Sequence, residues 1–204
     1  MDKKITAPRL IEMKREGIPI AALTAYDATF AAIEDKAGLD LILVGDSAGM
    51  VISGRPDTIS ITLDEMIFLT KNVSRGVKRA LLVGDMPFGI TQKSTEACVE
   101  ASIRFMKEGR AEAVKVEGAG PVLEAILRMT TMGMPVMGHL GLTPQSVHVF
   151  GGWDLRGANE KEAQRIKDDA LRLQDAGVFS MVLRRSPSSW QKRSANLWKF
   201  PPLE

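Results

Sequence analysis

The chain has 204 residues, 45% hydrophobic and 25% charged, which excludes a disordered polypeptide and allows one substantial core. A formal net charge of +2 with scattered lysines and arginines gives no case for nucleic-acid binding. Cys98 is the single cysteine, which excludes an internal disulfide and fits a reducing cytoplasm. No apolar run approaches the ~20 residues of a membrane span, so neither membrane insertion nor secretion is expected.

Apolar runs and turn residues alternate along the chain with a βα rhythm. Strands are expected at 18–26, 39–44, 79–85, 111–117, 134–139 and 179–183. Helices are expected at 28–37, 63–75, 95–108, 121–131 and 160–175, after a short surface helix at 6–16. The Thr62-Leu63-Asp64-Glu65 stretch resembles a capping box at a helix start. The connections 48–61 and 140–159 are expected to be long loops, the first a candidate lid.

These units predict the fold class. Each has about the length that a βαβ repeat needs, and no G-x-G-x-x-G motif follows the first strand, which argues against an open dinucleotide-binding sheet. The pattern therefore predicts an α/β fold, a (β/α)8 TIM barrel that is incomplete here, with about six βα units present. We predict a partial barrel catalytic domain over 1–183 and an aberrant tail without strand or helix period over 184–204.

Three of the expected strands end in an acid. Asp46 follows the wholly apolar run 41–44, and Asp85 and Glu117 end two later strands. A Gly-Asp pair often only caps a turn, but recurrence at three strand ends favours contact with a metal or substrate. Oxygen ligands suit a hard cation such as Mg²⁺, and the nitrogen and sulfur ligands of zinc are scarce here. Lys115, two positions before Glu117, is expected on the same face of its strand.

Six motifs, in this order, resemble those of one enzyme family. They are Leu-Thr-Ala-Tyr-Asp at 23–27, Leu-Val-Gly-Asp-Ser at 43–47, Gly-Asp-Met-Pro-Phe at 84–88, Val-Lys-Val-Glu-Gly at 114–118, Gly-His-Leu-Gly-Leu-Thr-Pro-Gln-Ser at 138–146 and Phe-Gly-Gly at 150–152. The family is ketopantoate hydroxymethyltransferase (3-methyl-2-oxobutanoate hydroxymethyltransferase). Over residues 1 to about 183, the chain is identified as a member by this resemblance.

The resemblance implies a reaction and a set of ligands. A hydroxymethyl group passes from 5,10-methylenetetrahydrofolate to 3-methyl-2-oxobutanoate, giving 2-dehydropantoate for pantothenate biosynthesis. Mg²⁺ is expected at Asp46, Asp85 and Glu117, and the 2-oxo acid is expected to contact Ser47, Lys115 and the two aspartates. The metal would polarise the 2-oxo group and the lysine would stabilise the enolate. A cytoplasmic homo-oligomer is implied, with small-molecule substrates and neither nucleic-acid nor membrane partners.

Two further positions carry open interpretations. His139, at the end of the fifth expected strand, is either catalytic or a satisfied structural histidine. The family's general base is a glutamate at the end of the sixth strand, but Arg184 stands there in this chain. The base is therefore missing, and we expect the chain as written to be inactive or nearly so.

The tail suggests a cause for the missing base. Back-translated with permitted codons and read one nucleotide earlier, 190–204 can spell a segment that resembles the family's sixth helix and seventh strand, and the same shift restores a glutamate at position 184. We therefore hypothesise a truncated or frameshifted product. The alternatives are another Mg²⁺-dependent oxo-acid lyase or aldolase, and a non-catalytic fragment that misfolds because apolar faces stay exposed.

Overall fold

The computed structural model describes residues 3–187, 198–199 and 201–203. In this part of the chain, one parallel sheet carries seven strands in sequence order. The strands are β1 (Ala22–Thr24), β2 (Leu41–Val44), β3 (Leu81–Asp85), β4 (Ala113–Glu117), β5 (Val136–Gly141), β6 (Ser180–Arg184) and β7 (Pro202–Leu203). Because every neighbouring pair is parallel and consecutive in sequence, the sheet has the topology of a partial (β/α)8 barrel, and the expected fold class is confirmed.

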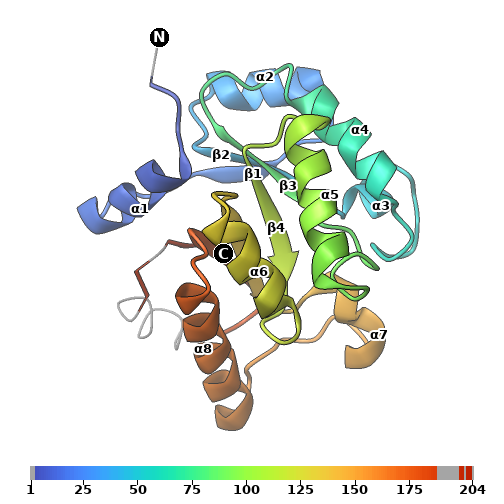
Figure 1. Ribbon diagram of the computed structural model, residues 1–204, viewed down its shortest axis with the longest axis vertical. Helices are drawn as coiled ribbons and strands as arrows, with labels where there is room; N and C mark the ends of the chain where they lie inside the picture. Colours follow the sequence, from blue (N-terminus) through green and yellow to red (C-terminus); the bar gives the residue numbers. More distant parts are fainter. Residues whose placement is uncertain (1–2, 188–197, 200, 204) are drawn as a thin grey trace.

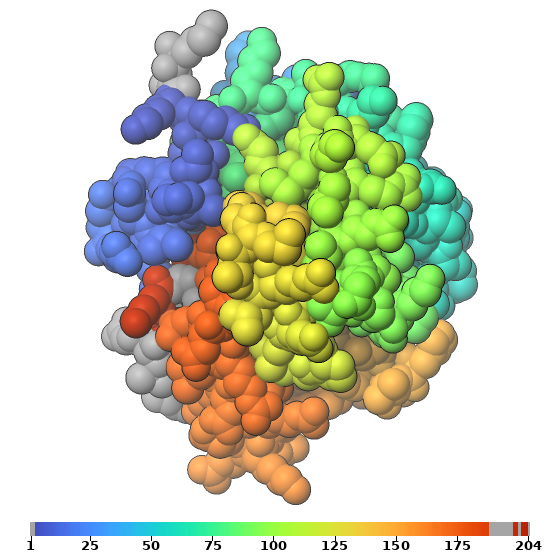
Figure 2. Space-filling view, in the orientation of Figure 1, coloured from blue at the N-terminus to red at the C-terminus, as the bar shows by residue number. Residues whose placement is uncertain are grey.

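Helices follow most of the strands and cover the outside of the sheet. They are α1 (Ala7–Glu16), α2 (Ala28–Lys36), α3 (Ala48–Val51), α4 (Leu63–Val73), α5 (Thr95–Lys107), α6 (Val122–Thr131), α7 (Val147–Phe150) and α8 (Glu160–Asp175), with a 3-10 turn η1 (Pro144–Ser146). Figure 1 shows α4, α5, α6 and α8 ranged along one side of the strands, with α1 set apart from them. In Figure 2, α5, α6 and α8 lie side by side and hide the strands from solvent.

Local sequence signals explain where the long helices begin. The Thr62 hydroxyl accepts a hydrogen bond from the Glu65 N–H, and the Glu65 carboxylate accepts one from the Thr62 N–H, so the expected capping box opens α4. Asn159 caps α8 by accepting from the Glu162 N–H at 2.9 Å. The expected range of α8 matches the observed one, whereas the expected first strand is cut to three residues.

Strand alternation divides the core into two clusters. Ile42 and Val44 of β2 face the surrounding helices, where they join the larger cluster with Met66 of α4. Leu41 and Val83 face the other way, into the smaller cluster inside the sheet. Both faces are apolar because a parallel barrel buries its strands on both sides. The inner face therefore leads, at the carboxyl ends of the strands, straight into the candidate site.

The first helix corrects a sequence expectation. The segment 6–16 was expected to be a surface helix, but Leu10 is fully buried and Met13 is 5% exposed. Both side chains pack with Leu41 and Met137 of the inner cluster, so α1 covers the interior of the sheet. Its basic outer residues had suggested a solvated helix, while its three buried positions form a stripe along one side.

Other segments also differ from expectation. The stretch 48–61 is not wholly a loop because α3 occupies its start, and η1 and α7 occupy part of 140–159. Strand β7 falls in the expected aberrant tail, and its Pro202 and Leu203 are in register with Met181 and Val182. The expected tail otherwise lies mostly outside the described residues, since 188–197 are among those not described. None of the described helices is long and apolar enough to cross a membrane.

Gly84 shows why glycine precedes the acid in β3. A Cβ atom at this position would lie 2.5 Å from Cδ1 of Phe105, a fully buried side chain of α5. The aromatic ring thus packs directly on the strand backbone. This packing sets the distance between α5 and β3 next to Asp85.

Candidate functional site

Four polar side chains continue the inner face of the sheet at its carboxyl edge. Asp85 follows Val83 by two positions, and Lys115 and Glu117 follow each other by two on β4, so each points inward by the strand period. Register places Asp85 level with Lys115, and Glu117 level with His139 of β5. All four are buried or nearly so, with Lys115 and His139 each 3% exposed. An apolar interior thus ends in a charged layer, the position of active sites in barrels of this kind.

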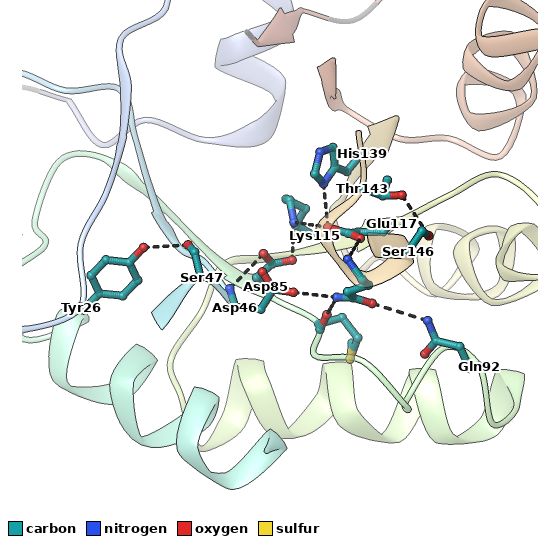
Figure 3. A network of polar contacts seen from close by, with 12 residues as sticks. Tyr26, Asp46, Ser47, Asp85, Gln92, Lys115, Glu117, His139, Thr143 and Ser146 are labelled. Atoms are coloured by element: carbon teal, nitrogen blue, oxygen red, sulfur yellow. Dashed lines mark hydrogen bonds and ion pairs between the residues drawn. The ribbon is translucent and has the colours of Figure 1, made fainter. Parts of the chain in front are cut away.

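The end of β2 contributes two more polar residues. Asp46 is 3% exposed, and its backbone N–H donates to Oδ2 of Asp85 at 3.2 Å. The neighbouring Ser47 begins the short helix α3, and its hydroxyl lies 2.8 Å from the hydroxyl of Tyr26, which follows β1. Tyr26 and Ser47 therefore form a polar pair on one flank of the acids (Figure 3).

Among the described residues, Lys115 is the single ammonium within the acid cluster. Its Nζ donates to Oδ1 of Asp85 and lies 3.9 Å from Oε1 of Glu117. Figure 3 shows Lys115 and Asp85 pointing toward each other, with Asp46 beside them and Glu117 on the far side of the lysine. The structure thus brings together all three acids that the sequence singled out, together with the lysine expected on the same face.

His139 faces Glu117. Its Nδ1 lies 2.9 Å from Oε1 of Glu117, an ion-pair distance, although the angles are not those of a hydrogen bond. Its Nε2 is buried and has no hydrogen-bond partner within the described residues. A buried imidazole nitrogen without a partner is costly, which makes it available to a ligand at this edge of the sheet.

Burial dominates the electrostatics of the two aspartates. Burial raises the pKa of Asp85 to about 8; Lys115 opposes this shift, and repulsion from Asp46 and Glu117 adds to it. Burial likewise raises the pKa of Asp46 above its ordinary value, against the attraction of Lys115 and with repulsion from Glu117. Three ionised carboxylates around one ammonium would carry an excess of negative charge, and the raised pKa of Asp85 means that protonation relieves part of it near neutral pH.

Burial and neighbouring charges also shift the pKa values of Lys115, His139 and Glu117, in different directions. Burial opposes the charge of Lys115, but attraction to Asp85, Glu117 and Asp46 outweighs it and raises the lysine's pKa. Burial lowers the pKa of His139, so its ring is neutral at pH 7. Burial acts to raise the pKa of Glu117, but His139, Lys115 and a backbone N–H outweigh it and lower the pKa. Because the imidazole is uncharged near neutrality, Lys115 and the N–H do more than His139 to keep Glu117 ionised.

The donor set suits a hard cation in chemistry and charge. Asp46, Asp85 and Glu117 offer carboxylate oxygens, the ligands that Mg²⁺ takes, and a divalent ion would offset the excess negative charge. In the described part of the chain, no group of three or more Asp, Glu, His or Cys side chains is already gathered around a common point. Lys115 lies among these acids, where its Nζ donates to Asp85 and is 3.9 Å from Glu117.

Arg184 ends β6 on the inner side of the sheet. It follows Val182 by two positions, and Val182 packs on the inner cluster, so the same alternation directs Arg184 toward the site. Register places it beside Gly141 of β5, and its guanidinium lies 5.9 Å from the Trp153 ring. Its charge also contributes to the lowered pKa of His139, after the larger effect of burial. A cation thus stands where the resemblance expects an acid.

Two functional candidates were missed by reading the sequence. Gln145 of η1 is 7% exposed and hydrogen-bonds to Asp46 and Glu117. Thr58, in the connection after α3, is 1% exposed, and its hydroxyl lowers the pKa of Asp46. The motif that contains Gln145 carried the signal, because a polar residue just after β5 lies at the same edge as the acids. Thr58 had no comparable signal, since it lies twelve positions beyond Asp46 in an irregular connection.

A cavity of about 820 Å³ lies beside the acid cluster rather than over it. One wall consists of Gly118, Leu140 and Thr143, which neighbour the site residues in sequence, and the opposite wall belongs to α8 with Arg165 and Arg172. The size is that of a site for a ligand much larger than a short oxo acid.

The chain matches the family model described as ketopantoate hydroxymethyltransferase over residues 4–201. Two relatives named 3-methyl-2-oxobutanoate hydroxymethyltransferase illustrate the likeness. The protein from Magnetococcus marinus is 47% identical over 203 residues, which cover 100% of this chain and 76% of the relative. The protein from Salinibacter ruber is 50% identical over 185 residues, which cover 91% of this chain and 70% of the relative.

Solved structures share the fold at low sequence identity. A phosphonopyruvate hydrolase in complex with oxalate and Mg++ has a TM-score of 0.72 at 13% identity, covering 97% of this chain and 71% of that one. A 2,3-dimethylmalate lyase of the PEP mutase/isocitrate lyase superfamily has a TM-score of 0.69 at 14% identity, covering 100% and 71%. At this level of identity the likeness supports the barrel architecture alone.

Proposed function

Since the chain belongs to the ketopantoate hydroxymethyltransferase family, we propose that its site is built for hydroxymethyl transfer from 5,10-methylenetetrahydrofolate to 3-methyl-2-oxobutanoate. The single observation that carries this proposal is the convergence of Lys115 with three buried carboxylates at the carboxyl ends of β2, β3 and β4. Such a layer is costly for a fold to maintain without a bound cation and an anionic ligand.

The three acids are assigned to a divalent metal and Lys115 to the substrate. Asp46, Asp85 and Glu117 would hold Mg²⁺, which supplies, when bound, polarisation of the 2-oxo group. The Lys115 ammonium, raised in pKa and buried, is positioned to attract the carboxylate of the 2-oxo acid and the negative charge that develops on its oxygen as the C3 proton leaves. Ser47, held by Tyr26, would donate to the same ligand.

His139 and the cavity have supporting roles in this proposal. The neutral imidazole holds its Nδ1 toward Glu117, and its buried Nε2 is free to exchange a hydrogen bond with the substrate. The adjoining cavity of about 820 Å³ has room for the larger folate co-substrate, beside the position where the oxo acid would bind.

Arg184 determines the rate that we expect for removal of the C3 proton. A guanidinium does not accept a proton at neutral pH, so it cannot act as the base that removes the C3 proton. General-base catalysis contributes roughly 10²–10⁴ in rate, and we expect the chain as written to lack this factor. We propose that the sequence of residues 184–204 departs from that of the family because of a shifted reading frame.

Deuterium exchange at C3 of 3-methyl-2-oxobutanoate, with Mg²⁺ and without folate, tests this function. The proposal expects slow exchange for the wild-type chain and an increase of roughly 10²–10⁴ for Arg184→Glu. Arg185→Glu is the matched control, because it makes the same charge change one position later, beyond the end of β6, where the side chain donates to the Trp153 carbonyl. Exchange absent from wild type and from both variants would overturn the assignment.

The remaining expectations rest on the family alone. A cytoplasmic homo-oligomer is proposed, in keeping with the lone cysteine. Size measurement of the purified chain in solution checks the oligomer, and a monomer at micromolar concentration would contradict it. A product that forms without folate would instead favour a lyase or aldolase reaction.

A further inference from the structure

Gln145 connects four strand ends through one residue. Its side-chain Nε2 donates to Oδ2 of Asp46 at 2.9 Å and to the Met86 carbonyl at 2.7 Å, while its backbone N–H donates to Oε2 of Glu117 at 3.1 Å. Asp46 follows β2, Met86 follows β3, Glu117 ends β4, and Gln145 itself follows β5.

The contacts fix which way the amide faces. The Met86 carbonyl can only accept a hydrogen bond, so the amide atom 2.7 Å from it is the nitrogen. The same nitrogen then presents its second hydrogen to Asp46, and the amide oxygen lies 3.5 Å from Nε2 of Gln92. Both side-chain hydrogens are thus used at a residue that is 7% exposed.

Gln145 hydrogen-bonds to one carboxylate oxygen of Asp46 and to one of Glu117. Gln145 donates to Oδ2 of Asp46 and to Oε2 of Glu117, and makes no hydrogen bond to the other oxygen of either acid; Oε1 of Glu117 instead lies 2.9 Å from Nδ1 of His139. Oε1 of Glu117 is buried and makes no hydrogen bond within the described part of the chain. A carboxylate pinned through one oxygen is oriented for ligation through the other, the usual task of groups behind a metal ligand.

We infer that Gln145 is a positioning residue that orients two of the three carboxylates for a divalent cation. This inference rests on the proposed function, because it assumes that Asp46 and Glu117 are ligands. Gln145 does not contact the reacting atoms, and it acts by holding strand ends β2 and β4 in one arrangement. The hydrogen bond from the Gln145 backbone N–H to Glu117 does not depend on the side chain. A substitution at position 145 therefore tests the side-chain hydrogen bond to Asp46.

Cation titration of the purified full chain tests the inference. Gln145→Met keeps the volume and length of the side chain and removes both donors. We expect the dissociation constants for Mg²⁺ and Mn²⁺, measured by calorimetry without substrate, to rise roughly 10–100-fold, the usual loss when a group behind a ligand is removed. Gln164→Met, at an exposed position of α8, makes the same substitution away from the acids and is expected to leave both constants unchanged.

A metal-free measurement separates orientation from folding. The urea midpoint of Gln145→Met is compared in the wild-type and Asp46→Ala backgrounds, and a direct bond between the two side chains requires a smaller shift in the second. Gln145→Asn serves where the methionine variant does not fold, since it keeps the amide but is too short to reach Asp46. It is expected to lose cation affinity as well.

The outcomes distinguish this inference from the proposed function. Weaker cation binding in the Gln145 variants with an unchanged Gln164 control supports the inference. Wild-type affinity within twofold in either folded Gln145 variant overturns it and leaves the proposed function standing. A wild-type chain that binds neither Mg²⁺ nor Mn²⁺ overturns both the metal assignment and the role of Gln145.

Discussion

The buried carboxyl of Asp85 offers a test of the charge excess. Asp85 is 2% exposed and its pKa is raised to about 8, chiefly by burial, from an ordinary 3.8. Replacing it with asparagine removes the titrating proton and keeps the size of the side chain. The amide has one acceptor oxygen, whereas the ionised Asp85 carboxylate accepts from both Lys115 and the Asp46 N–H, so one of these bonds is lost relative to the ionised form.

The pH dependence follows from the sign of the shift. A pKa that is higher in the folded state means that the folded chain holds its proton while the unfolded chain has released it, so stability present at low pH is lost as pH rises toward 8. Each pH unit between the two pKa values costs about 1.4 kcal/mol, so wild type should lose about 4 kcal/mol between pH 5 and pH 8. Asp85→Asn should lack this loss because its amide does not titrate, and at pH 5, where the Asp85 carboxyl is also neutral, its free energy of unfolding should be close to that of wild type.

Urea unfolding at pH 5 and pH 8 measures both quantities, with Asp154→Asn at an exposed position as the matched control. Mg²⁺ at a hundred times its dissociation constant should return about 3 kcal/mol to wild type at pH 8 and less to Asp85→Asn. A wild-type chain whose stability is equal at pH 5 and pH 8 without Mg²⁺, or an Asp85→Asn variant with the full wild-type pH dependence, would refute the reasoning.

Three shorter predictions follow from other contacts. Lys115→Met should weaken binding of the 2-oxo acid with Mg²⁺ by roughly 10–100-fold in calorimetry, because a charged donor is lost, and unchanged binding would contradict its role. Gly84→Ala should lower the free energy of unfolding by about 1–3 kcal/mol, since its Cβ would meet the Phe105 ring at 2.5 Å, and a neutral result would show that the ring moves aside. Hydrogen bonding to Arg55 lowers the pKa of Glu65 to about 2, so its stabilisation is present above about pH 4.5 and lost as pH falls toward 2. Glu65→Gln should therefore lower the free energy of unfolding by up to about 1 kcal/mol at pH 6, and by a smaller amount at pH 3. Urea unfolding measures both values, and an equal loss at the two pH values would contradict this prediction.

Much of the barrel was predictable because its signals are local. Apolar runs ending in Asp46, Asp85 and Glu117 identified three strand ends, and parallel strands bring such ends to one edge whatever else the chain does. The period of two placed Lys115 beside Glu117. The Thr62 capping box fixed the start of α4.

Contacts between distant segments were not predictable in the same way. Helix α1 read as a solvated helix because its basic residues outnumber its apolar ones, and its burial is decided by the open inner face of the sheet that it covers. Gln145 lies 99 positions from Asp46, and neither the residue types nor their spacing in the sequence predicts the hydrogen bond between them.

The sequence by itself determined the order of strands and helices and the acids at the strand ends, since both depend on neighbours within a few residues. Tertiary structure alone decided the protonation and orientation of those acids. Burial, which is a property of the assembled sheet and helices, raises the pKa of Asp85, and Gln145 reaches Asp46 only because β2 and β5 belong to the same curved sheet. Charge and hydrogen-bond energies depend on distance in space, which local sequence does not encode.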